Sequence, residues 1–210
     1  MKIVLDAVAK GRAQRALPET STTYETDRAT LAVAETEQRP TVLGLVASGR
    51  MKIDSGTVTI DGHVDAGAIR RRVALVDAPV VSEPESNVTV TGVVAEELMF
   101  AGHAPTPFAA QRWLEGLGLE SLASLPIGNV DASARIRLLL ELAALRKGVE
   151  GLVLVAPDRH GGEPVAWWRI AEEFAERGFA VLVIAGQASR TALEALTVRT
   201  SDDTRQGDAR

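Results

Sequence analysis

Two short runs of apolar residues, with an amphipathic segment between them, constrain this chain most. Residues 151–155 and 179–184 are apolar throughout, as expected for strands buried on both faces of a parallel sheet. Between them, Trp167 and Phe174 belong to an apolar stripe at helical spacing, and Gly178 follows as a stop signal. Because parallel strands need such a crossover, the pattern predicts a βαβ unit and an α/β fold with a mainly parallel sheet flanked by helices.

Similar signals place the remaining elements. Strands are predicted at residues 2–8, 29–34, 56–62 and 72–76. Helices are predicted at residues 40–49, 89–101, 107–117 and 163–177, together with a long helix that Asp131 caps. Ser189 is interpreted as another helix cap, whereas residues 11–28 fit either an antiparallel β region or a loop. We therefore predict one domain over residues 1–199, with a helical subdomain at roughly 87–127 plus the start of the helix from 131, and a polar tail at 200–210.

Composition excludes several classes of function. The 23 Lys and Arg residues against 28 Asp and Glu residues give a net charge of -5, which creates no general attraction for nucleic acid. The absence of cysteine removes thiolate metal sites, iron–sulfur clusters and thiol nucleophiles. No apolar run approaches the roughly 20 residues that span a bilayer. The start of the chain reaches the acidic residue Asp6 after three apolar residues, which is far short of a signal-peptide core. The expected location is the cytoplasm, at the inner face of the membrane only through a partner.

One segment resembles a known family closely enough to name it. Residues 40–62 are similar to the part of ATP-binding cassette (ABC) ATPases that runs from the end of the P-loop through the first helix into the next strand. The most specific part is Asp-Ser-Gly-Thr-Val-Thr-Ile-Asp-Gly at residues 54–62.

Later landmarks follow in the family's order. Residues 87–98 resemble the start of the helical subdomain, 128–145 the signature motif with its helix, 152–157 the Walker B strand, and 177–184 the strand before the switch histidine. The resemblance covers roughly residues 30–187. It implies a P-loop NTPase-like fold with a helical subdomain.

The phosphate-binding motif of the family is not intact. A P-loop needs glycines, whose amides wrap the phosphates, and a lysine that meets the β and γ charge. Aligning Thr41 with the last hydroxyl of the motif places Arg39 at the lysine and Pro40 at the preceding Ser/Thr position. Proline supplies neither a hydroxyl nor an amide donor. The glycine positions are Val33, Thr36 and Gln38.

The other motifs are degenerate too. The acidic pair of Walker B corresponds to Val155 and Ala156, with Asp158 a doubtful substitute. The signature motif falls on residues 130–134, where Asp131 would repel a γ-phosphate. The magnesium-sensing glutamine falls near Ala78, preceded by Asp77, and the switch histidine corresponds to Gly186. We therefore predict no catalytic residue.

Candidate cofactor contacts are few. Arg39 and Thr41 are the residues that would touch a nucleotide, although Arg39 also fits a solvated surface position. His63, His103 and His160 are scattered without ligand spacing, so no metal site is predicted. No cofactor is predicted, and ATP with magnesium remains the only one that the resemblance suggests.

Partner contacts are implied by the resemblance. In the family, a groove between the core and the helical subdomain receives a helix from the membrane permease. Val80, Val81 and Phe100 would supply apolar contacts there, although each also fits an ordinary core position. Trp168 points about 100° away from Trp167 around its helix and is either an interface anchor or the cover of a subdomain seam.

Three functions fit these observations. The first is a non-hydrolysing ABC ATPase-like subunit that docks on a membrane permease-like protein or pairs with an active homologous ATPase, with dimerisation left open. The second is an ATP-binding transport subunit that hydrolyses ATP through a composite site shared with a partner. The third is a soluble scaffold that kept only the fold.

Overall fold

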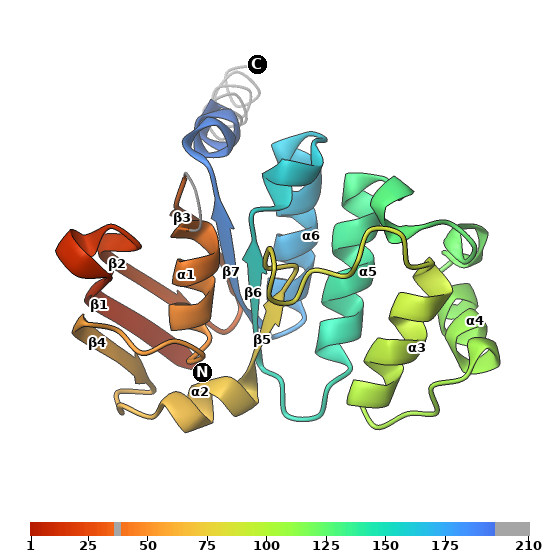
Figure 1. The fold of residues 1–210 in the computed structure, drawn as a ribbon, viewed down its shortest axis with the longest axis horizontal. Helices are drawn as coiled ribbons and strands as arrows, with labels where there is room; N and C mark the ends of the chain where they lie inside the picture. The colour runs from red at the N-terminus through yellow and green to blue at the C-terminus, as the bar shows by residue number, and fades with distance from the viewer. Residues whose placement is uncertain (36–38, 196–210) are drawn as a thin grey trace, which may run out of the picture.

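The protein is built from two β-sheets and the helices that cover them (Figure 1). The structure is a computed structural model, and it describes residues 1–35 and 39–195. Thr36 and Gln38, predicted at glycine positions of the P-loop, and the predicted tail at 200–210 lie outside the described residues.

A four-stranded parallel sheet forms the centre of the molecule. Its order is β3 (Arg28–Val33), β7 (Ala180–Ala185), β6 (Gly151–Val155) and β5 (Val73–Val76). Every neighbouring pair in this sheet is parallel. The α/β architecture expected from the apolar runs is thereby confirmed, with α6 (Pro164–Glu176) as the crossover between β6 and β7.

Alternate residues of the central strands face two separate cores. Leu152 and Leu154 of β6 belong to the core beneath α5 (Ala132–Ala144) and α6, whereas Val153 and Val155 belong to the core beneath α1 (Arg39–Ala47). The side chains of β6 and β7 are all buried. A strand covered on both faces has no polar side, which explains the unbroken apolar runs in the sequence.

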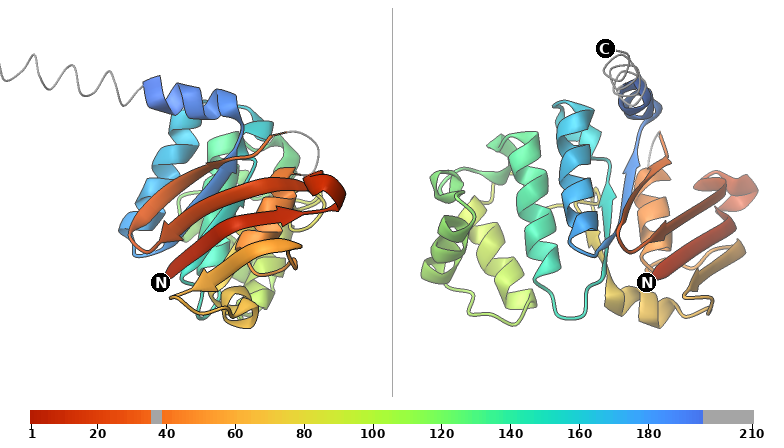
Figure 2. Two further views of the ribbon diagram at one scale, coloured as in Figure 1. Left: turned by 90° about the vertical axis from the view of Figure 1, so that its left-hand side faces the viewer. Right: turned by 180° about the vertical axis from the view of Figure 1, so that it is seen from behind.

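A second, antiparallel sheet lies beside the first. Its order is β2 (Leu17–Glu25), β1 (Lys2–Lys10) and β4 (Ser55–Ile60). This sheet faces the viewer in the left view of Figure 2. Residues 11–28 therefore form a β region with a short 3-10 turn, η1 (Arg12–Gln14), and the loop alternative is wrong. Polar threonines face outward along β2, while Tyr24 is buried, which makes this strand hard to recognise from hydrophobicity alone.

The predicted helices are present with small shifts of their ends. Beyond α5 stand α3 (Val90–Phe100) and α4 (Pro107–Gly116), which form a helical region on the far side of α5 from the sheets (Figures 1 and 2). Asp131 caps α5 as predicted, since its carboxylate accepts hydrogen bonds from the amides of Ser133 and Ala134. Short 3-10 segments connect the elements: η2 (Glu120–Leu122), η3 (Ile127–Asn129) and η4 (Pro157–His160).

The strand predicted at 72–76 begins one residue later than expected. Arg72 is the last residue of α2 (Ala66–Arg72), and β5 starts at Val73. Asp65 caps this helix by accepting from the amide of Ala68, so the basic residues lie in its last turn, where they complement the helix dipole.

Helix α1 packs unusually close to the parallel sheet because it contains Gly44. A Cβ atom on Gly44 would lie 2.7 Å from Cγ2 of Val155 and 3.0 Å from Cδ1 of Leu75. Only a residue without a side chain fits at these distances. This contact sets the amino end of α1 at the carboxyl edge of the parallel strands.

Candidate functional site

The carboxyl edge of the parallel sheet gathers polar residues from four loops. Asp77 follows β5, Asp158 follows β6, Gly186 follows β7, and Glu35 follows β3. Ligands of open α/β sheets bind outside the carboxyl ends of the strands, so this edge is the candidate site.

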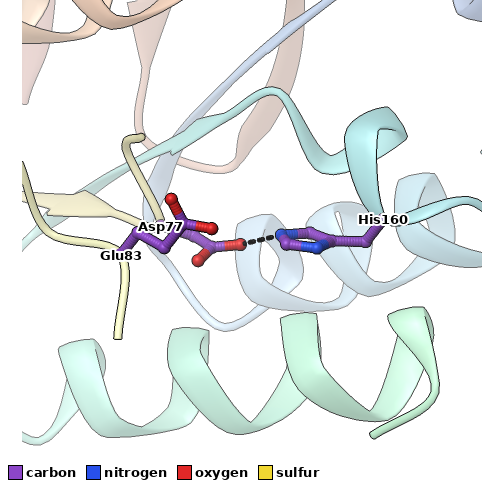
Figure 3. A group of neighbouring side chains, drawn as sticks. All are labelled: Asp77, Glu83 and His160. Atoms are coloured by element: carbon purple, nitrogen blue, oxygen red, sulfur yellow. Dashed lines mark hydrogen bonds and ion pairs between the residues drawn. The ribbon is translucent and has the colours of Figure 1, made fainter. Parts of the chain in front are cut away.

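Asp77 is the centre of a buried ion-pair network. Its Oδ1 lies 2.8 Å from Nη2 of Arg135 on α5 and 3.1 Å from Nη2 of Arg159, and its Oδ2 lies 2.8 Å from Nε2 of His160. Glu83 adds a second carboxylate, 3.2 Å from Nη2 of Arg159. Figure 3 shows that Asp77 and Glu83 lie side by side and that His160 approaches Asp77 from the opposite direction.

The network holds Asp77 in its charged form. Burial alone would raise the pKa of Asp77, but hydrogen bonds from His160 and Arg135, with the charges of Arg159 and Arg135, lower that pKa below its ordinary value of 3.8. Asp77 also has a positive φ of 55°, a conformation that aspartate tolerates better than most residues. The chain at the end of β5 is therefore organised around the carboxylate of Asp77.

Three groups in the network have the chemistry of metal ligands. One ligand atom each from Asp77, Glu83 and His160 lie within 4.8 Å of one another. The guanidinium groups of Arg135 and Arg159 already contact the same carboxylate oxygens, and a divalent cation would add two further positive charges beside them. The charge balance therefore favours an ion-pair network over a metal centre.

A second cluster closes the end of β7. Oδ2 of Asp158 accepts a hydrogen bond of 2.8 Å from the amide of Gly186, and Glu35 accepts one from the amide of Gln187. The hydroxyl of Ser189 donates to the same oxygen of Asp158 at 3.1 Å. Consecutive amides of this kind can hold an anion, but here they bind the chain's own carboxylates.

This cluster changes two sequence interpretations. Ser189 lies inside the helical segment 187–195 with its side chain buried against Asp158, so the helix-cap prediction is wrong. A Cβ atom on Gly186 would lie 2.8 Å from Oε1 of Glu35 and 3.1 Å from Oδ2 of Asp158. A side chain at the position aligned with the switch histidine would therefore have to displace the carboxylate of Glu35 or of Asp158.

Arg39 and Thr41, the predicted cofactor contacts, lie in the first turn of α1. Arg39 is half-buried rather than solvated, and its Nε is buried without a hydrogen-bond partner among the described residues. It lines a cavity of about 420 Å³ together with Glu35 and Gln187. Thr41 is 8% exposed. Arg39 thus faces a cavity, but one that also carries a carboxylate.

Val80, Val81 and Phe100 lie on the surface. Their exposed fractions are 98%, 51% and 58%, so the core alternative is wrong for all three. The loop that presents Val80 is held by the carbonyl of Ala78, which accepts hydrogen bonds from the amides of residues 81, 82 and 83. Val80 has a φ of 65°, which is strained for a β-branched residue. A fixed loop therefore displays an apolar side chain to solvent.

Trp168 has a different environment. It is half-buried, packs against the core under α6, and donates from Nε1 to Glu172 at 2.8 Å. These contacts show a side chain packed against the core, and its role as a partner contact stays a prediction.

Sequence reasoning missed the partners of Asp77. Arg159 and His160 follow the predicted strand at 151–155, just as Asp77 follows the predicted strand at 72–76. Since neighbouring parallel strands end at the same edge, these opposite charges could have been expected to meet. Arg135 carried no such signal, because it lies within the stripe of an amphipathic helix.

Comparisons with known proteins identify the fold. No protein-family model and no curated protein matches the sequence. A nucleotide-free ATP-binding cassette from an ABC transporter matches with a TM-score of 0.61 at 17% identity, covering 89% of this chain and 82% of that one. An ABC-transporter cassette in its ADP conformation matches with a TM-score of 0.59 at 18% identity, covering 89% of this chain and 82% of that one. CbiO1 of Clostridium perfringens, part of the ABC transporter complex CbiONQ, matches with a TM-score of 0.60 at 14% identity. The match covers 88% of this chain and 77% of that one.

These likenesses establish the fold class. The chain has the α/β, P-loop NTPase-like fold of ABC ATP-binding cassettes, with a parallel sheet flanked by helices. In residues 1–35 and 39–195, no helix combines the length and apolar character needed to cross a membrane.

Proposed function

We propose that this protein is an ABC ATPase-like subunit that does not hydrolyse ATP and acts by binding another protein. The partner would be a membrane permease-like protein or an active homologous ATPase, which places the chain at the cytoplasmic face of the membrane. CbiO1, a neighbour in fold, is described as part of a transporter complex, which supports this kind of partner.

The observation that carries the proposal is the closure of the carboxyl edge by the protein's own charges. Asp158 and Glu35 occupy the amides of Gly186 and Gln187, and Asp77 is saturated by two arginines and a histidine. A γ-phosphate entering this edge would meet two carboxylates where it needs amide donors and a metal. Like charges repel, so nucleotide binding is disfavoured.

The second support is the loop after β5. Val80 is almost fully exposed, and the surrounding hollow of about 530 Å³ is lined by the apolar residues Val81 and Pro84 and by the polar residues Glu83, Glu85 and Ser86. Exposed apolar side chains on a fixed loop are suited to contact a partner protein. Val81 belongs to the same surface, and Phe100 lies on α3 with Arg146 stacked on its ring at 5.7 Å.

Calorimetry tests the nucleotide part of the proposal. Titration with Mg-ATP to millimolar concentration should give no binding heat and no turnover. The double variant Glu35→Gln/Asp158→Asn removes both negative charges and should show weak nucleotide binding if those charges are what excludes phosphate. Micromolar binding with turnover by the unmodified protein would contradict the proposal.

Co-purification tests the partner part. The protein isolated from its native membrane fraction should carry an integral membrane protein with it, and Val80→Asp should release that partner. Val64→Asp is the matched control, because Val64 is also exposed, at 76%, but lies in the turn before α2. Release by both variants, or an entirely soluble pool, would favour the scaffold alternative.

The composite-site alternative has one observation in its favour. The buried Nε of Arg39 has no hydrogen-bond partner among the described residues and lies beside the 420 Å³ cavity, where it could meet an anion brought by a partner. In that case, mixing with partner ATPases should raise turnover, and Arg39→Ala or Asp158→Ala should reduce it.

A further inference from the structure

A third hollow lies in the helical region. It has a volume of about 360 Å³ and lies at the turn between α3 and α4, close to the end of α5. In Figure 1 this turn is at the opposite end of the helices from the carboxyl edge of the parallel sheet. The hollow is therefore separate from the loop that displays Val80.

The walls of the hollow are apolar. Leu98 comes from α3, Ala109 and Trp113 from α4, and Leu145 from the residue that follows α5. Leu98 is buried, whereas Trp113 and Leu145 are half-buried, so their side chains present apolar surface to the open space. Small-molecule sites typically have volumes of about 300–1,000 Å³ and mainly apolar walls with a few polar groups.

The charged side chain in the lining of the hollow is basic. Arg112 and His103 line it, and no acidic residue does. Among the described residues Arg112 has no ion pair; its guanidinium lies 5.8 Å from the ring centroid of Phe108, which is 72% exposed. A guanidinium without a carboxylate partner, at the edge of an apolar surface, is suited to bind an anionic group attached to an apolar body.

We propose that this hollow binds a small aliphatic carboxylate, with the chain against Leu98, Leu145 and Trp113 and the carboxylate toward Arg112. The apolar walls supply most of the binding free energy, because they exclude water from the chain of the ligand. Arg112 supplies the preference for an anion. Its contribution is modest because the side chain is exposed and screened by solvent.

Decanoate, used below its micelle concentration, is the probe. A terminally brominated decanoate should quench tryptophan fluorescence of the full chain in a saturable manner. Trp113→Leu should abolish the quenching, and Trp168→Phe should leave it intact. Arg112→Gln should weaken binding about three- to fivefold, the range expected for an exposed charge pair, whereas Arg169→Gln, an exposed arginine on α6, should leave it unchanged.

Charge selectivity completes the test. Neutral decanol should bind the unmodified protein at least about threefold more weakly than decanoate, and Arg112→Gln should remove this difference. If Trp113→Leu does not fold, as judged by circular dichroism, the Arg112 and Arg169 pair alone decides the outcome. Equal binding of decanol and decanoate, non-saturable quenching, or binding only to anionic vesicles would overturn the proposal. The proposal would also be overturned if the protein formed a dimer that Trp113→Leu dissociates and if its tryptophan fluorescence did not respond to decanoate.

Discussion

Oδ1 of Asp77 lies 2.8 Å from Nη2 of Arg135, and the two side chains are 0% and 3% exposed. Arg135 also donates from Nη1 to the carbonyl of Ile127 at 3.2 Å. One buried guanidinium therefore joins the end of β5, helix α5 and the segment η3 that follows the helical region. The loop that displays Val80 begins at this junction, so its position depends on the same ion pair.

Breaking this pair should destabilise the protein strongly. Asp77→Asn leaves Arg135 and Arg159 facing a neutral amide in a buried place, and we expect the free energy of unfolding to fall by about 3–5 kcal/mol. Urea denaturation monitored by circular dichroism measures the change.

Arg137→Gln is the control, because the pair between Arg137 and Glu173 is 2.6 Å long but exposed at 36% and 49%. That variant should change the unfolding free energy by less than about 1 kcal/mol. Equal effects of the two variants would contradict the assignment of a buried network.

The lowered pKa of Asp77 predicts a dependence of stability on pH. A carboxyl group whose pKa is lower in the folded state stabilises the fold above its ordinary pKa, here 3.8, and this contribution is lost as the pH falls below that value. The urea midpoint of the unmodified protein should therefore drop between about pH 5 and pH 2. Asp77→Asn should show a smaller drop over the same interval, since it has no proton to bind at this position. If the urea midpoint of Asp77→Asn dropped as much as that of the unmodified protein, Asp77 would not be the cause of the pH dependence.

The fold could be predicted from the sequence wherever local patterns are strong. The apolar runs at 151–155 and 179–184 correspond to β6 and β7 because both faces of these strands are covered. The sequence leaves strand β2 undecided because its partner strands and its bulges fix it, not its own polar sequence. Its two fully buried residues, Leu17 and Tyr24, are too far apart to give an alternating pattern.

The edge at which the polar loops meet could be predicted from the sequence, but its contacts could not. The resemblance aligns Ala78, Val155, Ala156 and Gly186 with functional positions of the family, and Asp77 and Asp158 are neighbours of these positions whose loops the structure brings to one edge. Which atoms pair there depends on distances between residues up to 152 positions apart, as for Glu35 and Gln187. Val80 is a different case: in the sequence an apolar residue in a short loop fits a partner contact as well as core, and the turn on Ala78 directs it outward.

The close contacts of Gly186 give a third prediction. Gly186→Ala places a Cβ atom 2.8 Å from Oε1 of Glu35, which must displace a carboxylate from its amide. We expect a loss of about 0.5–1.5 kcal/mol in unfolding free energy, the range for one lost hydrogen bond, because the contacted oxygen is the end of a flexible, exposed side chain. Gly116→Ala is the matched control, because a Cβ atom there meets nothing within 4 Å. Alanine is the better helix former, so this control should be neutral or slightly stabilising. Tolerance of alanine at Gly186 would show that the closed edge can open readily.

The buried tyrosine gives the last prediction. Tyr24 is fully buried and donates from Oη to the carbonyl of Ala47 at 2.7 Å, which ties β2 to the end of α1. Burial raises the pKa of Tyr24 well above its ordinary value of 10.0, despite the opposing charge of Arg50. The neutral phenol therefore stabilises the fold at neutral pH, and this contribution is lost as the pH rises above about 10.

Because the chain has a single tyrosine, tyrosinate absorbance reports this residue alone. During an alkaline titration, the absorbance should rise together with the loss of the circular dichroism signal. Tyr24→Phe should lower the unfolding free energy at neutral pH by about 1–3 kcal/mol, because the carbonyl of Ala47 loses its donor. Ionisation near pH 10 in the folded protein would contradict the burial of this hydroxyl and the docking of β2 on α1.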